Sequence, residues 1–481
     1  MGQEIGRSGF SEADFRRFRE RLRDETELLG QWLREGRVAQ QDATTIGLEL
    51  EAWLADAEGA PAPVSDRVLA GVDDPRVENE LALFNLEVNT DVRPLAGEPF
   101  AGLHEELSGR WDRTRQAAGA VGVRPVLAGI LPSITEADLS LDSMTPSPRY
   151  AALNEQVLAL RERRPLEIDI AGAERWCTER TDVMLEAATT SLQLHLQVSP
   201  TRIADAFNAA VAVSAPAVAV AANSPYLFGH RLWAESRIPL FEQAVACTRL
   251  EPHGAGALAR VGFGSGYARD ALYSFFVENR QHHPVLLPEL QEAPPEALAH
   301  LRLHNGTIWR WNRPLVEVAE GACHLRLEHR VMAAGPTLAD VVANAAFFYG
   351  VVADLAETDP PVVERLPFQV AEQNFYSAAR YGLGAEIEWL DGWYGRVDEL
   401  ILERLLPAAR RGLVRSGVSR AEAEAHLAVI EERVASGWNG AAWQVAWVER
   451  HGADWRALTR AYIERADSGE PVHRWPLSAG P

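Results

Sequence analysis

Several segments of the chain alternate apolar and polar residues with a period of two, the pattern of β-strands that have one buried face. Such strands are typical of antiparallel sheets with one face packed on a core. We therefore predict an antiparallel sheet. Its expected strands lie at 46–54, at 81–90, from Arg124 to near Pro132, at 190–200, in a turn and strand at 304–314, and at 323–337.

Other segments repeat apolar residues at helical intervals. The first follows Ser11, which with Asp14 has the spacing of a capping box, and Gly36 is a plausible end. From about residue 337 onward the pattern turns helical, and Ser419 and Asp454 are expected helix caps. Helices and a sheet that follow one another in this way predict an α+β fold with a helical C-terminal region.

One Ala- and Val-rich stretch, residues 203–225, is apolar enough to resemble a membrane span. It is only weakly hydrophobic and contains Asp205, Asn208 and Pro216, whereas a spanning helix needs about 20 strongly apolar residues. We therefore expect a buried core helix that is kinked near Pro216, and no membrane partner.

The chain has 481 residues and a formal net charge of −21. Non-specific nucleic-acid binding relies on basic patches, so this acidic balance argues against nucleic acid and anionic membranes as partners. The three cysteines are far apart and do not have the spacing of a zinc site or a disulfide framework. The first residues lack the apolar core of a signal peptide, so we expect a cytoplasmic protein. A homo-oligomeric state is left open.

The polar faces of the predicted strands carry mainly acidic side chains, one histidine and arginines. Carboxylates are natural ligands of Mg²⁺, and a single imidazole among them also suits Mn²⁺. Arginines suit phosphate and carboxylate groups because the guanidinium fork matches two oxygens. Each residue alone also fits a solvated face, a satisfied histidine or a plain ion pair, so only the joint pattern indicates a metal and phosphate site. The residues are Glu49, Glu51, Glu87, His195, Arg326, Glu328 and Arg330.

The order of several short motifs resembles the glutamate–cysteine ligase family, including the bacterial carboxylate–amine ligases. The motifs are GLELE at 47–51, ELALFNLEVNT at 80–90, LQLHLQV at 192–198, AANSPYLFGHRLWAESR at 221–237, WNRP at 311–314 and LRLEHRV at 325–331. The resemblance implies a glutamine-synthetase-like domain, in which a curved antiparallel sheet flanked by helices forms the active-site floor. It also implies ATP and two or three Mg²⁺ ions, with amide formation through an acyl phosphate, most simply between glutamate and cysteine as in glutathione biosynthesis.

The patterns and the resemblance together predict four parts of the chain. They are an N-terminal helix at 1–40, a glutamine-synthetase-like catalytic domain at 41–340, a helical region packed on the core at 341–467 and a tail at 468–481.

The resemblance also implies roles for individual residues. Arg237, Arg313 and Arg330 would act near the substrate and the acyl phosphate, and Arg330 with Asn223 and Ser224 would contact the nucleotide. The implied metal ligands are Glu49, Glu51, Glu80, Glu87, His195 and Glu328. Glu80 and Glu87 are an odd number of residues apart, so one strand face cannot hold both and Glu80 is expected in the preceding loop.

Other functions stay open at this point. The same floor would serve a ligase for a different amino acid pair, a metal-dependent phosphotransferase without ligation, or a non-catalytic nucleotide-binding member of the family. The retained acidic ligand set argues against the non-catalytic alternative.

Overall fold

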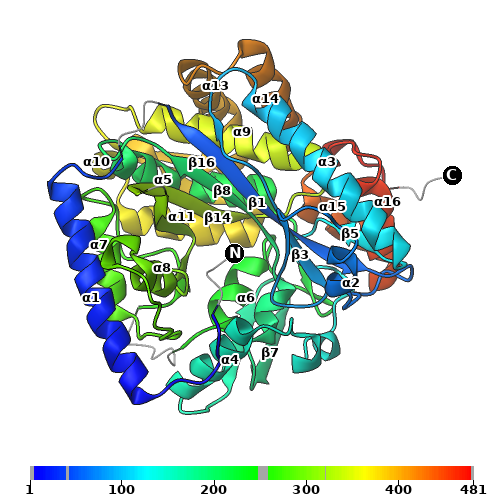
Figure 1. Ribbon diagram of the computed structural model, residues 1–481. Helices are drawn as coiled ribbons and strands as arrows, with labels where there is room; N and C mark the ends of the chain where they lie inside the picture. Colours follow the sequence, from blue (N-terminus) through cyan, green and yellow to red (C-terminus); the bar gives the residue numbers. More distant parts are fainter. Residues whose placement is uncertain (1–4, 40–42, 248–257, 320, 478–481) are drawn as a thin grey trace.

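The computed structural model describes residues 5–39, 43–247, 258–319 and 321–477, and it holds one large antiparallel sheet surrounded by helices (Figure 1). The sheet is strongly curled, as a half-barrel. Its hydrogen-bonded order is β13-β14-β8-β1-β3-β2, and β4 and β5 also pair with β1. The strands of this sheet are β1 (Thr45–Ala55), β2 (Val77–Asn79), β3 (Asn85–Asn89), β4 (Arg93–Pro94), β5 (Arg124–Val126), β8 (Ser191–Gln197), β13 (Asn312–Ala319) and β14 (Ala322–Ala333).

Four two-stranded pairs lie outside this sheet. They are β6 (Leu166–Ala171) with β7 (Arg175–Arg180), β9 (Tyr226–Leu227) with β10 (His230–Arg231), β11 (Val261–Gly262) with β12 (Trp309–Arg310), and β15 (Glu386–Trp389) with β16 (Trp393–Arg396). The last pair interrupts the region after residue 337 that we predicted to be helical.

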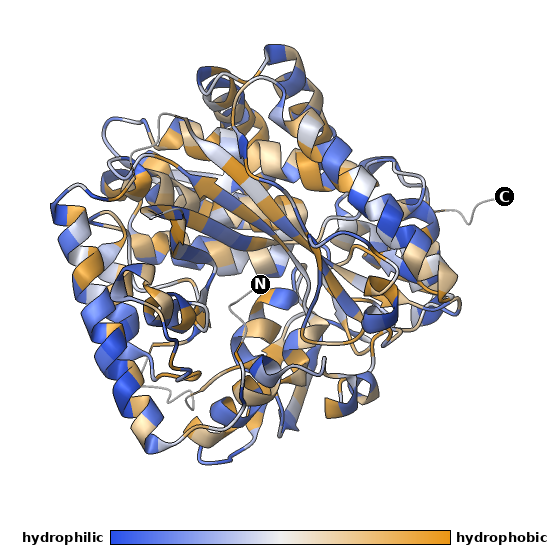
Figure 2. Cartoon of the chain, in the orientation of Figure 1, coloured by the Kyte–Doolittle hydropathy of each residue, from blue (hydrophilic) through white to orange (hydrophobic). Residues whose placement is uncertain are grey.

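The helices carry most of the remaining chain, and Figure 2 shows long hydrophilic stretches on α1 and α3. Their bounds are α1 (Glu12–Arg34), α2 (Ser65–Leu69), α3 (Pro99–Ala120), α4 (Pro148–Leu160), α5 (Ile203–Ala221), α6 (Arg237–Ala244), α7 (Tyr273–His282), α8 (Ala299–Asn305), α9 (Leu338–Leu355), α10 (Val362–Arg365), α11 (Phe368–Tyr381), α12 (Val397–Leu400), α13 (Leu406–Arg415), α14 (Arg420–Ser436), α15 (Gly440–His451) and α16 (Trp455–Ala466).

The apolar face of the sheet packs against α5 and α9. The leucines that alternate with the polar residues of β1 and β8, such as Leu48, Leu50 and Leu194, are fully buried. On β14, His329 lies on this side and stacks on Phe348 of α9, with ring centres 4.1 Å apart. Since helices cover this face, the carboxylates on the other face point away from them, toward the site described below.

The helices α5 and α9 are long and apolar enough to cross a membrane, but 89% and 83% of their apolar windows are buried within the protein. The prediction of a buried core helix at 203–225 is therefore confirmed. The helix continues through Pro216 without interruption. The proline therefore does not end the helix, and residues on both sides of it are buried.

Most predicted elements appear with altered bounds. The capping box of the first helix is confirmed, since Ser11 accepts from the Asp14 amide and Asp14 accepts from the Ser11 amide at 2.9 Å. The strand expected from Arg124 to near Pro132 is wrong in length, because β5 ends at Val126. Beyond it the chain is buried but irregular, and the Ala128 carbonyl accepts from the indole of Trp53 at 3.2 Å.

The C-terminal segment is tied to the core at one buried carboxylate. Asp340 at the start of α9 accepts from Arg433 of α14 at 2.7 Å, and both side chains are almost fully buried. The backbone amide of Val472 also donates to Asp340, and Trp475 packs edge-on against Trp443. Val472 and Trp475 of the predicted tail thus pack on the core. Residues 478–481 and the boundary predicted at 40/41 lie outside the described residues.

Candidate active site

The register of the sheet brings the predicted metal ligands together. Glu51 of β1 lies opposite Glu87 of β3, and His195 of β8 lies opposite Glu328 of β14. Directly opposite residues on antiparallel strands share a face, with Cβ atoms about 4.5–5.5 Å apart. Glu49 lies two positions from Glu51 on β1, so it shares that face as well. Strand pairing alone therefore gathers these five side chains in one region.

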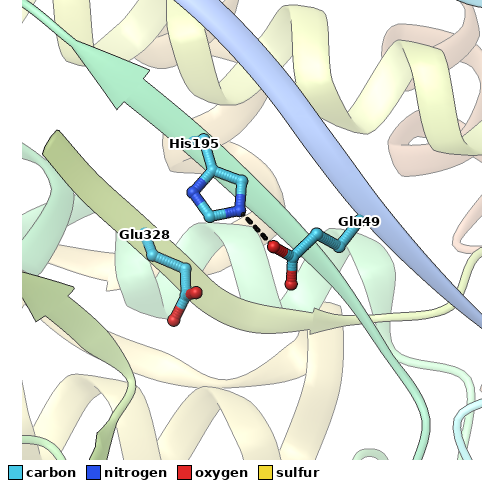
Figure 3. Close-up of side chains that lie close together, drawn as sticks. All are labelled: Glu49, His195 and Glu328. Carbon is cyan, nitrogen blue, oxygen red and sulfur yellow. Dashed lines mark hydrogen bonds and ion pairs between the residues drawn. The ribbon is translucent and has the colours of Figure 1, made fainter. Parts of the chain in front are cut away.

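The first group, here called the histidine cluster, consists of Glu49, His195 and Glu328. One ligand atom from each residue lies within 4.8 Å of the others. The imidazole Nε2 of His195 is 2.9 Å from Oε1 of Glu49, and Glu328 reaches the same space from β14 (Figure 3). Three neighbouring strands of the sheet thus supply one residue each.

The second group, here called the carboxylate cluster, consists of Glu51, Glu80 and Glu87, whose ligand atoms also lie within 4.8 Å of one another. Glu80 sits in the loop directly after β2, where the odd spacing to Glu87 placed it. Glu51 accepts from the Ser191 amide at 2.6 Å and from the Gln193 side chain at 2.7 Å. These bonds hold the Glu51 carboxylate in place within its cluster.

The clusters differ in their electrostatics. Burial opposes ionisation of Glu328, but the guanidinium groups of Arg313 and Arg330 lower its pKa to about 2. Burial raises the pKa of Glu51 to about 7. Burial and repulsion from its two carboxylate neighbours raise the pKa of Glu80 well above its ordinary value. The histidine cluster thus holds an ionised carboxylate at neutral pH, while the carboxylate cluster contains repulsion that a divalent cation would relieve.

The donor sets fit a hard divalent cation. Five carboxylates and one imidazole match the oxygen preference of Mg²⁺ and the tolerance of Mn²⁺ for one nitrogen. Within the described residues, the buried Nδ1 of His195 has no hydrogen-bond partner, which leaves one polar atom of the cluster for another ligand. The residues present are therefore compatible with metal ions at both clusters.

The four arginines that the sequence analysis singled out line the same pocket as the carboxylates of the clusters, and they are Arg237, Arg313, Arg326 and Arg330. Arg313 donates to both oxygens of Glu328, at 2.6 and 2.7 Å. Arg330 donates to Gln193 and, at 3.2 Å, to Glu328. Arg237 is more deeply fixed, because it donates to the Val331 carbonyl and to Glu235, and its guanidinium lies over the Trp311 ring. The pocket therefore carries positive charge directly beside the carboxylates.

The structure does not place Asn223 and Ser224 with the other predicted site residues. Both side chains are fully buried, and neither lines the pocket where the two clusters lie. Asn223 donates to the Ala334 carbonyl at 2.8 Å, and Ser224 donates to Glu235 at 2.6 Å. Since Glu235 also accepts from Arg237, these residues support the segment that carries Arg237 and have no free group for a nucleotide.

Some pocket residues were missed by the sequence analysis. Gln193 shares the polar face of β8 with His195, so the period-two alternation contained the signal. Glu186 and Arg149 lie in a short 3₁₀ segment and in α4, where no alternation marks them. Trp309 and Trp311 also line the pocket.

The curled sheet with its helices is the architecture of glutamine-synthetase-like ligases. Within that class, a glutamate–cysteine ligase from Francisella tularensis in complex with AMP shares the fold, with a TM-score of 0.56 at 12% identity. The alignment covers 92% of this chain and 91% of that chain. The predicted fold class is therefore confirmed.

The chain belongs to the glutamate–cysteine ligase family 2 (GCS2), whose sequence pattern matches residues 45–461. A relative from Rhodococcus jostii, provisionally named glutamate–cysteine ligase 2-2, is 26% identical over 76% of this chain and 84% of its own length. A relative of the same provisional name from Nocardia farcinica is 25% identical over 82% and 88%. The predicted family is confirmed, and the protein is an amide-forming carboxylate–amine ligase.

Proposed function

We propose that this protein is an ATP- and Mg²⁺-dependent carboxylate–amine ligase that works through an acyl phosphate and joins glutamate to cysteine. One observation carries the proposal: the five carboxylates of the histidine cluster and the carboxylate cluster line one pocket, together with arginines. Phosphoryl transfer needs little covalent chemistry from the protein, and it is accelerated by positioning and by neutralising charge. This pocket offers the groups for both.

The proposed reaction has two steps. The substrate carboxylate takes the γ-phosphoryl group of ATP, and ADP leaves. The amine then attacks the acyl carbon, inorganic phosphate leaves, and the amine gives up a proton as the amide forms. When bound, Mg²⁺ would supply positive charge against the phosphate oxygens.

The residues of this chain have defined parts in the proposal. Glu49, Glu51, Glu80, Glu87, His195 and Glu328 would hold the metal ions. Arg330 and Arg313 present guanidinium forks that suit phosphate and carboxylate oxygens. Arg237 is anchored by Glu235 and fixes positive charge at the wall of the pocket.

The similar proteins support the choice of nucleotide and substrates. The Francisella enzyme was solved with AMP, and both curated relatives carry a glutamate–cysteine ligase name. Together with the pocket chemistry, these names make ATP, glutamate and cysteine the first compounds to test. A cytoplasmic location is part of the same proposal.

The test is a mass-spectrometric search for new amides after incubation of the purified protein with ATP, Mg²⁺ and pooled amino acids, alongside a measurement of ADP. The proposal predicts ADP release that requires both Mg²⁺ and an amine, and a γ-glutamylcysteine product. An amide from other amino acids would support a ligase with a different substrate pair. ADP release with a phosphorylated product and no amide would favour the phosphotransferase alternative, and no nucleotide turnover would favour the non-catalytic one.

A further inference from the structure

Glu186 is a pocket carboxylate outside both ligand clusters. It lies in η3 (Met184–Ala188), directly before β8, and its side chain lines the same pocket. The segment is held in a tight turn, since the Glu186 amide donates to the Val183 carbonyl at 3.0 Å and its own carbonyl accepts from Thr189. The neighbouring residues of the turn are buried. The backbone therefore fixes the carboxylate at the pocket wall.

The Glu186 carboxylate differs from the other acidic groups of the pocket in its partners. Glu328 is paired with Arg313, Glu51 accepts from Ser191 and Gln193, and Glu317 is paired with Arg302. For Glu186, the described part of the chain supplies no hydrogen bond or ion pair to the carboxylate. Glu186 is half-buried. An acidic group that is partly removed from water without a partner is destabilised, so such groups in a pocket commonly meet their partner on the ligand.

The surroundings of Glu186 indicate the charge of that partner. Burial raises the pKa of Glu186 to about 7, although Arg330 and Arg149 act in the opposite direction. These guanidinium groups do not fully compensate for the lost hydration. A cationic hydrogen-bond donor brought by a ligand would do so, since hydrogen bonds between charged groups are the strong ones.

We infer that Glu186 binds the ammonium group of an amino acid substrate and so selects amino acids over simple carboxylic acids. The inference rests on the proposed function and names the substrate class for the same pocket. Arg149 lines the same pocket and donates to the Gly306 carbonyl at 3.3 Å, so it adds positive charge near the carboxylate of a zwitterion. A ligand that carries both charges is thereby favoured over one that carries only the carboxylate.

A metal role for Glu186 is the main competing explanation. The two groups of side chains whose ligand atoms approach within 4.8 Å do not include it. Glu186 nevertheless interacts electrostatically with the carboxylate cluster, because Glu51 raises the pKa of Glu186. The experiment must therefore separate amino acid binding from Mg²⁺ binding.

Calorimetric titration of the full-length protein provides this separation. The standard L-amino acids are titrated one by one in the presence of Mg²⁺, and the tightest binder is compared with the matching acid that lacks the amino group, which for L-glutamate is glutarate. The variants are Glu186→Gln, which keeps the size of the side chain, and Glu186→Ala. The control is Glu155→Gln on α4, a half-exposed carboxylate paired with Arg163 outside the pocket.

The expected result is that Glu186→Gln weakens the amino acid by about tenfold or more, the effect of losing a charged hydrogen bond. Binding of the acid without the amino group and of Mg²⁺ alone stays within about twofold, as does every ligand for the control. The inference would be overturned if Glu186→Gln weakened the amino acid and the acid without the amino group equally, weakened Mg²⁺ alone, or left all binding unchanged. It would also be overturned if the wild-type protein bound no amino acid. Amide formation unaffected by Glu186→Gln would refute only the inference, whereas selective binding without any amide product would refute only the proposed ligation.

Discussion

Replacing Glu328 with glutamine removes the charge at the centre of the histidine cluster. In the wild type this carboxylate is 1% exposed and accepts from Arg313 at 2.6 and 2.7 Å and from Arg330 at 3.2 Å. Glutamine has almost the same size, but its NH₂ group has to face one of these guanidinium donors. The variant thus keeps the packing while it loses a metal ligand and an ion pair.

The size of the effect on stability follows from the pKa of Glu328. A carboxyl whose pKa is about 2 in the folded protein, against an ordinary 4.5, stabilises the fold by about 3 kcal/mol at neutral pH. Because the folded pKa is lowered, this stabilisation is present above pH 4.5 and is lost as the pH falls toward 2. Glu328→Gln should therefore reduce the free energy of unfolding by about 3 kcal/mol at pH 7 and by much less at the acid end.

Glu328→Gln should also reduce the catalytic activity. Loss of a partner in the outer shell of a metal site typically costs about 10–100-fold, so loss of a ligand should reduce Mg²⁺-dependent ADP release by at least about 100-fold. Urea unfolding at several pH values and ADP release on protein shown to be folded measure the two effects. Glu357→Gln, a half-exposed partner of Arg202, is the control. Unchanged ADP release would remove Glu328 from the metal site, and an unchanged free energy of unfolding would refute the electrostatic argument.

Two further predictions concern supports of the site. Tyr349→Phe removes the hydroxyl that lies 2.9 Å from the Gly47 carbonyl and 3.0 Å from the His195 carbonyl, so unfolding in urea should show a loss of about 1–2 kcal/mol, and equal stability would contradict it. Burial raises the pKa of Glu242 to about 7. Between pH 4.5 and 7 the folded state therefore keeps a proton that the unfolded state releases. The contribution of Glu242 to the free energy of unfolding falls as the pH rises through this range. Thermal unfolding of Glu242→Gln should lack this part of the pH dependence, and the same pH profile as the wild type would exclude Glu242 as its source.

Strand alternation explains why part of the site was readable from sequence. A period of two put Glu49 and Glu51 on one face, and the odd spacing put Glu80 in a loop. Alternation cannot give the register between strands that lie far apart in the chain. It therefore could not tell that Glu49 joins His195 while Glu51 joins Glu87.

The positions of Asn223 and Glu186 could not be predicted for a related reason. The resemblance implied that Asn223 contacts the nucleotide, but its partners include Tyr462 and Ala334, each more than 100 positions away. Nothing local to Asn223 marks those partners. Glu186 gave no signal either, because a single carboxylate in a short turn has no period. For both Asn223 and Glu186, the position in the folded chain, rather than local sequence preference, determines whether the side chain lines the pocket.

The central position of β1 has a consequence for synthesis of the chain. This strand is made early, yet one of its two edges is completed by β8, where Ser191 bonds to Glu51 across 140 positions. At about 5–20 residues per second, a ribosome needs roughly 7–28 s to cover that distance. During this interval one edge of β1, with an apolar face and open hydrogen-bonding groups, has no neighbour. We therefore expect the nascent chain to bind chaperones and to aggregate at high expression.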